Sequence, residues 1–230
     1  MFGSLVRRFV HDIGFTPVWT EQPTIRMRAF VRDAPSRRHN KYLRKVKKMV
    51  PGLVYDARIL KNRIKIAIPF SDIDSEAKKR HFFNKVYQLD LYESETQSEP
   101  SQSVKGLVTQ SIICVNNEKP MNVNFMLFQE GRRYRLMIPL ILDFQSSNPH
   151  ILAGAGLDIQ LTHIPCVWQG DEKIPEFIYE NIANMPLNKS VTIDELNYPP
   201  GLEFDMDLLP FDKVVYSLSY KQKELEREQK

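Results

Sequence analysis

Apolar and polar residues alternate in many segments of this 230-residue chain, and a period of two is typical of half-buried β-strands. In the first such segment, IRMRAFV at 25–31, the arginines fall on one face and most apolar side chains on the other. Further strands are expected within 53–59, 63–70, 82–92, 104–115 and 121–128. Ser71 and Asp72 can cap a short helix that runs through His81, and residues 93–103 (ESETQSEPSQS) predict a flexible loop.

A second group of short strands is expected after the polar break Gln129-Glu130-Gly131. It starts with RRYRLMIPLILDF and continues in segments that proline, glycine and asparagine turns separate, which is typical of a small all-β domain. Its expected core is Ile138, Leu140, Ile159, Leu161, Ile164, Phe177, Ile178, Val191, Leu196 and Phe204. The tail KQKELEREQK is a mixed-charge helix without a broad apolar stripe.

One stretch, SRRHNKYLRKVKKMVPGLVYD at 36–56, departs from the alternation. Its first half predicts a helix, which Pro51 and Gly52 would end. The apolar stripe of that helix is Tyr42, Val46, Met49 and Val50, and its basic face is Arg37, Arg38, Lys41, Arg44, Lys45, Lys47 and Lys48. A solvated surface helix usually pairs lysine with glutamate four residues away, but no acid lies between Asp33 and Asp56. This uncompensated basic face favours binding to nucleic acid.

The net charge of +4 hides a strong asymmetry between the two halves of the chain. Residues 1–66 carry sixteen Lys and Arg against four acids, whereas residues 140–209 carry two against eleven. We therefore expect one module to face phosphate and the acidic module to contact mainly protein. Contacts with RNA should decrease sharply after Arg135, so that Arg132, Arg133 and Arg135 mark the edge of the RNA footprint.

Signals for catalysis or metal binding are weak. His163 and Cys166 could each bind zinc, but no second pair completes four ligands, and Gly154-Ala-Gly156 lacks the third glycine of a dinucleotide loop. The sequence contains no nucleophile elbow. Its two cysteines give no disulfide framework, so a reducing compartment is the default expectation. The sequence contains no run of eighteen apolar residues, so we expect no segment that spans a membrane. We expect no enzymatic activity, cofactor, metal, membrane contact or small-molecule substrate.

Two tracts carry a resemblance to a known family. Residues 25–56, IRMRAFVRDAPSRRHNKYLRKVKKMVPGLVYD, resemble the opening of the bacterial 5S-rRNA-binding large-subunit ribosomal protein numbered twenty-five: a strand, a basic loop and helix, then a strand ending near tyrosine. The tract PMNVNFMLF resembles the closing strand of its first domain. AGAGLDIQLTHIPCVW and KIPEFIYENIANMPLNKSVTIDELNYPPGLEF resemble the second domain of the longer form, called CTC or general stress protein, so that the resemblance covers about residues 25–206.

The resemblance implies a mainly β fold with short helices: an N-terminal β-barrel-like RNA-binding domain followed by a small all-β C-terminal domain. The corresponding boundaries are 1–24 for an N-terminal extension, 25–129 for the barrel-like domain, 130–209 for the C-terminal domain and 210–230 for a charged tail. Asp56 stands where the family has glycine, and Asn122 and Asn124 stand where it has histidine and aspartate. The family's histidine contacts 5S rRNA, so this contact is altered here.

The expected function is that of a structural constituent of the large ribosomal subunit, with rRNA (5S rRNA where it is present) and neighbouring ribosomal proteins as partners. The RNA-binding residues expected from the basic face and the resemblance are Arg26, Arg28, Arg32, Arg37, Arg38, Lys41, Arg44, Lys45, Lys47, Lys48, Tyr55 and Asn122. Residues 1–11 loosely fit a mitochondrial presequence, which favours a mitochondrial ribosome over a plastid or the bacterial cytoplasm. A protein–protein adaptor that has lost its RNA, or a stress-related assembly factor, is the alternative.

Overall fold

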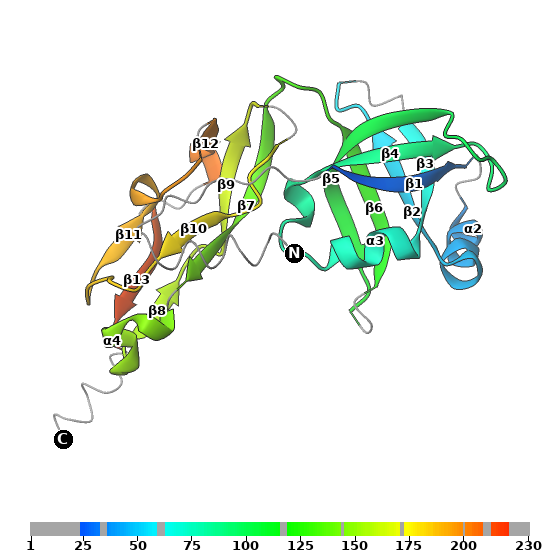
Figure 1. The fold of residues 1–230 in the computed structure, drawn as a ribbon. Coiled ribbons are helices and arrows are strands. Elements are labelled where there is room, and N and C mark those ends of the chain that lie inside the picture. The colour runs from blue at the N-terminus through cyan, green and yellow to red at the C-terminus, as the bar shows by residue number, and fades with distance from the viewer. Residues whose placement is uncertain are drawn as a thin grey trace.

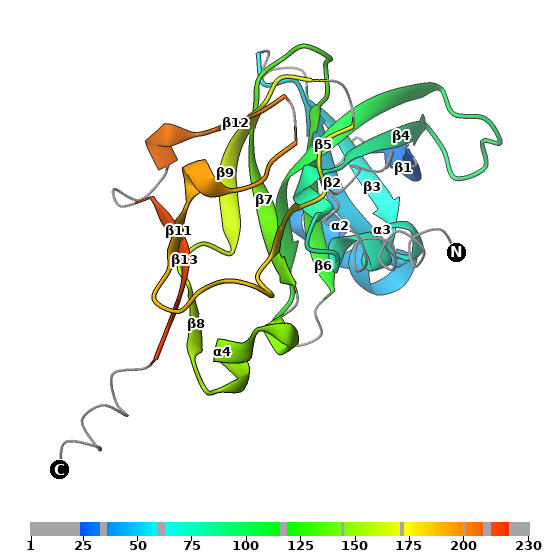
Figure 2. The same ribbon diagram turned by 60° about the vertical axis from the view of Figure 1, so that its left-hand side comes forward.

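The computed structural model describes residues 24–32, 36–58, 63–115, 119–143, 145–170, 173–199, 201–208 and 213–220. These residues form a barrel and a second, smaller β unit that lie side by side (Figure 1, Figure 2). The fold is mainly β with short helices, as the sequence predicts. The expected N-terminal extension, apart from residue 24, and the expected helix at 221–230 lie outside the described residues.

Six strands close the N-terminal barrel in the order β1-β3-β2-β6-β5-β4, which confirms the barrel-like expectation. The strands are β1 (Ile25–Val31), β2 (Met49–Tyr55), β3 (Arg63–Pro69), β4 (Val86–Tyr92), β5 (Gln102–Ile113) and β6 (Pro120–Leu127). Inward-facing side chains alternate along each strand and fill the interior. The largest of them are Tyr87, Phe125, Met27, Ile66, Ile68 and Leu89.

Barrel closure brings β2 very close to β6 at Gly52, which pairs with Val123 in parallel register. A Cβ atom at position 52 would lie 2.1 Å from the carbonyl oxygen of Val123, so only glycine fits this contact. Pro51 is paired with Ala67 of β3 and precedes the first residue that pairs with β6. The two residues expected to end a helix therefore lie inside a strand, because the barrel needs this close approach.

Helix α3 (Phe70–Ala77) packs on the barrel through Ile73, which is fully buried in the same core. Its N-cap is Pro69 rather than the predicted Ser71-Asp72, and Ser71 instead donates a hydrogen bond to Asp72. The predicted strand at 82–92 begins only at Val86, because the 3-10 helix η2 (Phe82–Asn84) precedes it. Strand β5 starts at Gln102, so the loop after β4 ends at residue 101, and the last two residues of the loop predicted at 93–103 belong to the strand.

Two small sheets form the second unit, in the orders β10-β7-β9-β12 and β11-β13-β8. The strands are β7 (Tyr134–Asp143), β8 (Gly156–Ile159), β9 (His163–Trp168), β10 (Ile178–Asn181), β11 (Ser190–Thr192), β12 (Leu202–Phe204) and β13 (Val214–Ser219). The short helices are η3 (Gln145–Ser147), α4 (Pro149–Leu152), η4 (Ile193–Glu195) and η5 (Met206–Leu208). Asn148 caps α4 through its side-chain oxygen, which accepts from the backbone N–H of His150.

Strand β13 corrects the predicted charged tail at 210–230. It pairs with both β11 and β8, and Val215, Tyr216 and Leu218 are buried in the core of the second unit. The alternating segment VVYSLS therefore belongs to the fold, although acids and lysines surround it in the sequence. Of the ten core positions expected for this unit, Ile159 is wrong: its side chain is exposed at the end of the edge strand β8. Phe177 is only half-buried and lies outside the core cluster, which contains the other eight.

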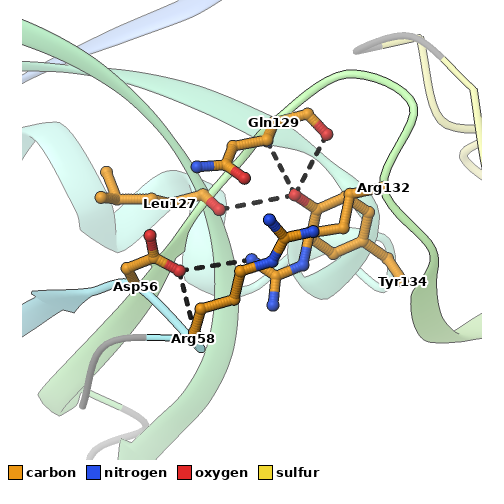
Figure 3. A network of polar contacts seen from close by, with 6 residues as sticks. All are labelled: Asp56, Arg58, Leu127, Gln129, Arg132 and Tyr134. Atoms are coloured by element: carbon orange, nitrogen blue, oxygen red, sulfur yellow. Dashed lines mark hydrogen bonds and ion pairs between the residues drawn. The ribbon is translucent and has the colours of Figure 1, made fainter.

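The connection between the two units is held by the network in Figure 3. Arg132 pairs with Asp56 at 3.3 Å, and its guanidinium lies over the ring of Tyr134. The Tyr134 hydroxyl accepts from the backbone N–H of Gln129 at 2.7 Å. Asp56, which replaces the glycine of the resembling family, thus ties the end of β2 to this connection.

Direct packing also joins the units. Val86 and Leu107, on the outside of the barrel, belong to the same apolar cluster as the core of the second unit. The side-chain amide of Asn84 donates to the carbonyl oxygen of Met137 at 3.0 Å, and Glu176 lies 3.6 Å from the ammonium group of Lys85. The proposed boundary at 129/130 thus separates two units that share a packed interface.

Candidate nucleic-acid interface

The basic segment folds as two successive helical turns of different pitch: α2 (Arg37–Tyr42) and the π-helical η1 (Leu43–Lys47). The Ser36 hydroxyl caps the helix by accepting from the backbone N–H of His39 at 3.0 Å. Lys48 ends it in the left-handed conformation (φ 53°), with its N–H bonded to the carbonyl of Leu43. The helix is therefore shorter than predicted, and β2 already starts at Met49.

The predicted apolar stripe of this helix is wrong. Tyr42 and Val46 are 45% and 62% exposed, and the other two predicted members lie in β2. Leu43 is the buried residue instead, at 6% exposure, and η1 contacts β2. Leu43 is the one buried apolar side chain of the two helical segments, because the change to π-helical pitch shifts the spacing of the side chains.

Most of the predicted basic residues point to solvent. Arg37, Arg38, Lys41, Lys45 and Lys48 are exposed, and none makes an ion pair with another described residue. No acid lies on the helix to offset their charge. Figure 1 shows α2 on the side of the barrel away from the second unit. This end of the barrel therefore presents unneutralised positive charge, which suits a polyanion.

Two predicted contacts are partly occupied within the chain. Lys47 binds both carboxylate oxygens of Glu95, at 3.0 and 2.9 Å, and this hydrogen bond raises the pKa of Lys47. Arg44 is half-buried and reaches the carbonyl oxygen of Met121 at 3.5 Å, so that it links the helix to the start of β6. Because Glu95 already pairs with its ammonium group, Lys47 is less available to bind a phosphate than Lys41 or Lys45.

Arg28 and Arg32 are engaged as well. The Arg28 guanidinium forms a two-point ion pair with Asp72 of α3, at 3.1 and 3.2 Å. Arg32 donates to the side-chain oxygen of Asn40, and burial lowers the pKa of Arg32. Both residues hold helices in place on the barrel, so they have a structural role that their charge alone does not reveal.

The Arg28 pair gives a pH-dependent prediction. Burial by itself would raise the pKa of Asp72, but hydrogen bonds from Arg28 and Ser71 outweigh it and lower that pKa. The pair therefore stabilises the fold above the ordinary aspartate pKa of about 3.9, and its contribution is lost as the pH falls through the lowered folded value. Arg28→Gln should lower the free energy of unfolding by less than about 1 kcal/mol at about pH 7, because the pair is exposed.

Urea denaturation at about pH 7 and about pH 2.5 measures this effect, and Arg26→Gln is the matched control on the same strand. Arg26 is exposed and makes no ion pair with another described residue, so its substitution should leave the stability unchanged at both values. A loss for Arg28→Gln that is equally large in acid would contradict a role through ionised Asp72.

A row of polar side chains crosses the outside of β2, β6 and β5 beside the helix. Asn122 donates to the side-chain oxygen of Asn124 at 3.1 Å, and Asn124 donates to that of Gln110 at 3.0 Å. Tyr55 donates to the hydroxyl of Thr109 at 3.1 Å. We call Tyr55, Thr109, Gln110, Asn122 and Asn124 the amide row. Amide and hydroxyl groups both donate and accept, so they can bond sugar hydroxyls and base edges.

The twelve predicted residues thus divide between two places. The helix, Tyr55 and Asn122 lie on one side, with Arg44 beside the start of β6 and Arg32 bonded to Asn40 of the helix. Arg26 and Arg28 lie on β1, which is three strands from β6 in either direction around the six-stranded ring, and therefore opposite to it. The structure brings the helix and the amide row together, and it separates the two arginines of β1 from the amide row.

Four residues of this surface were missed by the sequence prediction. Thr109, Gln110 and Asn124 complete the amide row, and exposed Arg63 pairs with Tyr55 in the register of β3 and β2. The alternation in the segments 63–69 and 120–127 could have placed Arg63 and Asn124 outside the barrel, because their neighbours are apolar. Gln110 was not predictable, because a bulge between Val108 and Gln110 changes the alternation.

Arg132, Arg133 and Arg135, the predicted edge of the footprint, pair with acids of the protein. Arg133 contacts Glu203 at 3.0 Å, and Arg135 contacts Asp205 and Asp207, each at 3.0 Å. Part of the excess negative charge of the second unit is therefore neutralised by the segment that leads into it. Arg133 and Arg135 each keep 63% of their side-chain surface exposed, so they still contribute positive charge at the boundary between the basic barrel and the acidic second unit.

The alternative chemistry considered for His163 and Cys166 does not fit the structure. His163 is exposed, whereas Cys166 is buried three residues later in the same strand, so the two side chains leave β9 on opposite faces. Burial raises the pKa of the Cys166 thiol to about 12. Among the described residues, no group of three or more His, Cys, Asp and Glu could hold a metal ion. No helix of the described chain is long and apolar enough to cross a membrane.

Comparison with known proteins finds several relatives that all have the same name. A protein named large ribosomal subunit protein bL25 from Nitrobacter winogradskyi is 30% identical over 84 residues, which are 36% of this chain and 36% of the relative. The bL25 of Bradyrhizobium diazoefficiens is 24% identical over 168 residues, 67% of this chain and 60% of the relative. For the bL25 of Wolbachia pipientis the identity is 21% over 185 residues, 80% of this chain and 85% of the relative.

The chain spans less than two thirds of the length of the first two relatives. No family model matches the sequence. The relatives are bacterial proteins, so they lend no support to the predicted mitochondrial location, which stays a prediction. Their names are those of ribosomal proteins and not of enzymes. The weak similarity extends over most of the chain and agrees with the motifs in both units, so the chain is a diverged homologue of the large ribosomal subunit proteins named bL25.

Proposed function

We propose that this chain is a structural component of the large ribosomal subunit, and that it binds rRNA through the α2–η1 helix and the amide row. The observation that carries this proposal is the juxtaposition of five exposed cations, which form no ion pair within the described chain, with a row of amide and hydroxyl groups on one side of a rigid barrel. The names of the relatives, large ribosomal subunit protein bL25, support it.

The two parts of this surface would have different roles. Lysine and arginine side chains of the helix neutralise phosphates and release counterions, which gives affinity without sequence preference. The amide row would contact 2′-hydroxyls and base edges in the wide, shallow minor groove of an RNA helix. Because every strand of the barrel is paired, the two parts keep a fixed distance, so the shape of the RNA is selected.

We further propose 5S rRNA as the RNA where the ribosome contains it. The resembling family places a histidine and an aspartate where this chain has Asn122 and Asn124, and the two asparagines are bonded to each other. Neutral amides replace a titratable pair, so RNA binding here should not depend on the protonation of a histidine at this position. The two amides still offer donors and acceptors at this place.

The acidic second unit would face protein in the assembled particle. Its acids repel phosphate at close range, and those beside the connection already hold Arg133 and Arg135. Basic neighbouring ribosomal proteins have the complementary charge. The unit would then bridge the RNA-bound barrel to these neighbours, in agreement with the division of charge along the sequence.

Sedimentation of cell extracts tests the proposal. The full chain should sediment with large ribosomal subunits and remain there after a high-salt wash, as a stable component does. Crosslinking should recover rRNA on the peptide 37–48. Release of the chain by the wash would favour a transient assembly factor, and crosslinks to protein without rRNA from this peptide would favour an adaptor.

A further inference from the structure

A groove of about 350 Å³ lies where the barrel meets the second unit. This volume is within the range of about 300–1,000 Å³ that is usual for small-molecule sites. Residues from η2, β5 and β6 form one wall, and residues from β7 and β9 form the other. The walls are fixed relative to each other, because the Asn84 side chain donates to the carbonyl oxygen of Met137 across the base of the junction.

The charge of the groove differs from that of the second unit. No aspartate or glutamate lines it, whereas Arg80, Arg135 and His163 do. Arg135 is already held by Asp205 and Asp207, but exposed Arg80 makes no ion pair with another described residue. An anionic group near Arg80 would therefore meet a free guanidinium and no opposing carboxylate in the wall.

One aromatic ring is displayed in the groove. Phe83 is 39% exposed, although it follows the fully buried Phe82. The two rings pack edge to face, with their centroids 5.5 Å apart. This contact fixes the orientation of the Phe83 ring. Met137, 48% exposed on the opposite wall, supplies a second apolar surface. A rigid exposed ring beside a free arginine is the combination that binds a stacked base and its phosphate.

The groove continues into the amide row. Thr109 lines the groove, and its hydroxyl accepts from Tyr55 and donates to the backbone carbonyl of Asn124 at 3.3 Å. An RNA strand that lies along the amide row would thus reach Phe83 without crossing a part of the barrel that the second unit covers. The positive charge of the groove, its exposed aromatic ring and its continuity with the amide row all favour RNA as the ligand.

We infer that the groove between the barrel and the second unit binds an unpaired nucleotide of RNA, with its base stacked on Phe83 and its phosphate bound by Arg80. This inference rests on the proposed function, because it extends the same RNA surface beyond the helix and the amide row. It gives the second unit a role in RNA binding, namely to complete the groove with β7 and β9.

Fluorescence anisotropy with the full chain tests it, with a short labelled oligoadenylate and a labelled hairpin duplex RNA as the two probes. Loss of one stacked base should weaken oligoadenylate binding by about tenfold in Phe83→Leu, which keeps an apolar side chain but removes the ring. Phe83→Tyr keeps the ring and should bind as the wild type does. Arg80→Ala should weaken oligoadenylate binding and reduce its salt dependence by about one phosphate contact.

The hairpin probe separates this inference from the proposed function. Neither Phe83→Leu nor Arg80→Ala should change hairpin binding, which depends on α2–η1. Wild-type binding to the hairpin with equal oligoadenylate binding by all variants, or with none by the wild type, would overturn the groove and leave the proposed function intact. Arg80→Ala also covers the case in which Phe83→Leu fails to fold, because Arg80 is exposed and unpaired within the described chain.

Discussion

Replacing Arg37, Lys41 and Lys45 together by alanine should weaken binding to rRNA and flatten its salt dependence. These side chains are exposed and form no ion pair within the described chain, so each is free to neutralise a phosphate. Each lost phosphate contact removes about 0.7–0.9 units from the slope of log K against log salt, which gives a decrease of about two to three units. Titrations at several salt concentrations measure this slope.

Alanine has the highest helix propensity, so the triple variant should keep the helix. Lys47→Ala is the matched control, because it removes the same charge from the same segment but a charge that Glu95 already neutralises. It should change the slope by less than Lys45→Ala does. An unchanged slope in the triple variant would show that α2–η1 does not contact phosphate.

The sequence predicts the kind of structure well where local pattern decides it. The alternation in IRMRAFV corresponds to β1, whose Met27 and Ala29 are buried while Arg26 and Arg28 point outward. The absence of acids from residues 36–55 predicts the unneutralised helix, and five of its seven cations are indeed exposed and form no ion pair within the described chain. Both features depend on neighbouring residues alone, so a single sequence contains them.

The errors occur where distant residues decide the local structure. A helix through Val50 satisfies the spacing of its apolar residues, but β6 and β3 recruit Met49–Tyr55 into the barrel. Strand β13 is surrounded by charges and gains its stability from pairing with β8 and β11 and from the burial of Val215, Tyr216 and Leu218. Burial against a distant partner outweighs local propensity in both cases.

The candidate interface divides in the same way. Charge predicts which residues can contact phosphate, but only the closed strand order shows that β1 lies opposite β6. The partners of the cations are equally distant in sequence: Lys47 pairs with Glu95 and Arg28 with Asp72. A count of positive charges therefore overestimates the number of residues that are free to bind RNA.

The second large effect is expected at Gly52, where β2 and β6 approach most closely. Gly52→Ala should lower the free energy of unfolding by about 3 kcal/mol or more, because its Cβ would lie 2.1 Å from the carbonyl oxygen of Val123. Backbone atoms cannot move aside without breaking the parallel pairing of Gly52–Tyr55 with Val123–Met126. Urea denaturation followed by circular dichroism measures this loss.

Gly106→Ala is the matched control in the same barrel. Its Cβ would meet only side-chain atoms, those of Phe125 and Leu89 at 3.2–3.4 Å, which can shift by a few tenths of an ångström. Both substitutions restrict the unfolded chain equally, so the difference between them reports the contact in the folded barrel. We expect Gly106→Ala to cost about 1 kcal/mol. Because β2 begins directly after the helix that we propose to bind RNA, Gly52→Ala should also weaken rRNA binding. A Gly52→Ala variant as stable as Gly106→Ala would show that β2 and β6 are not in this register.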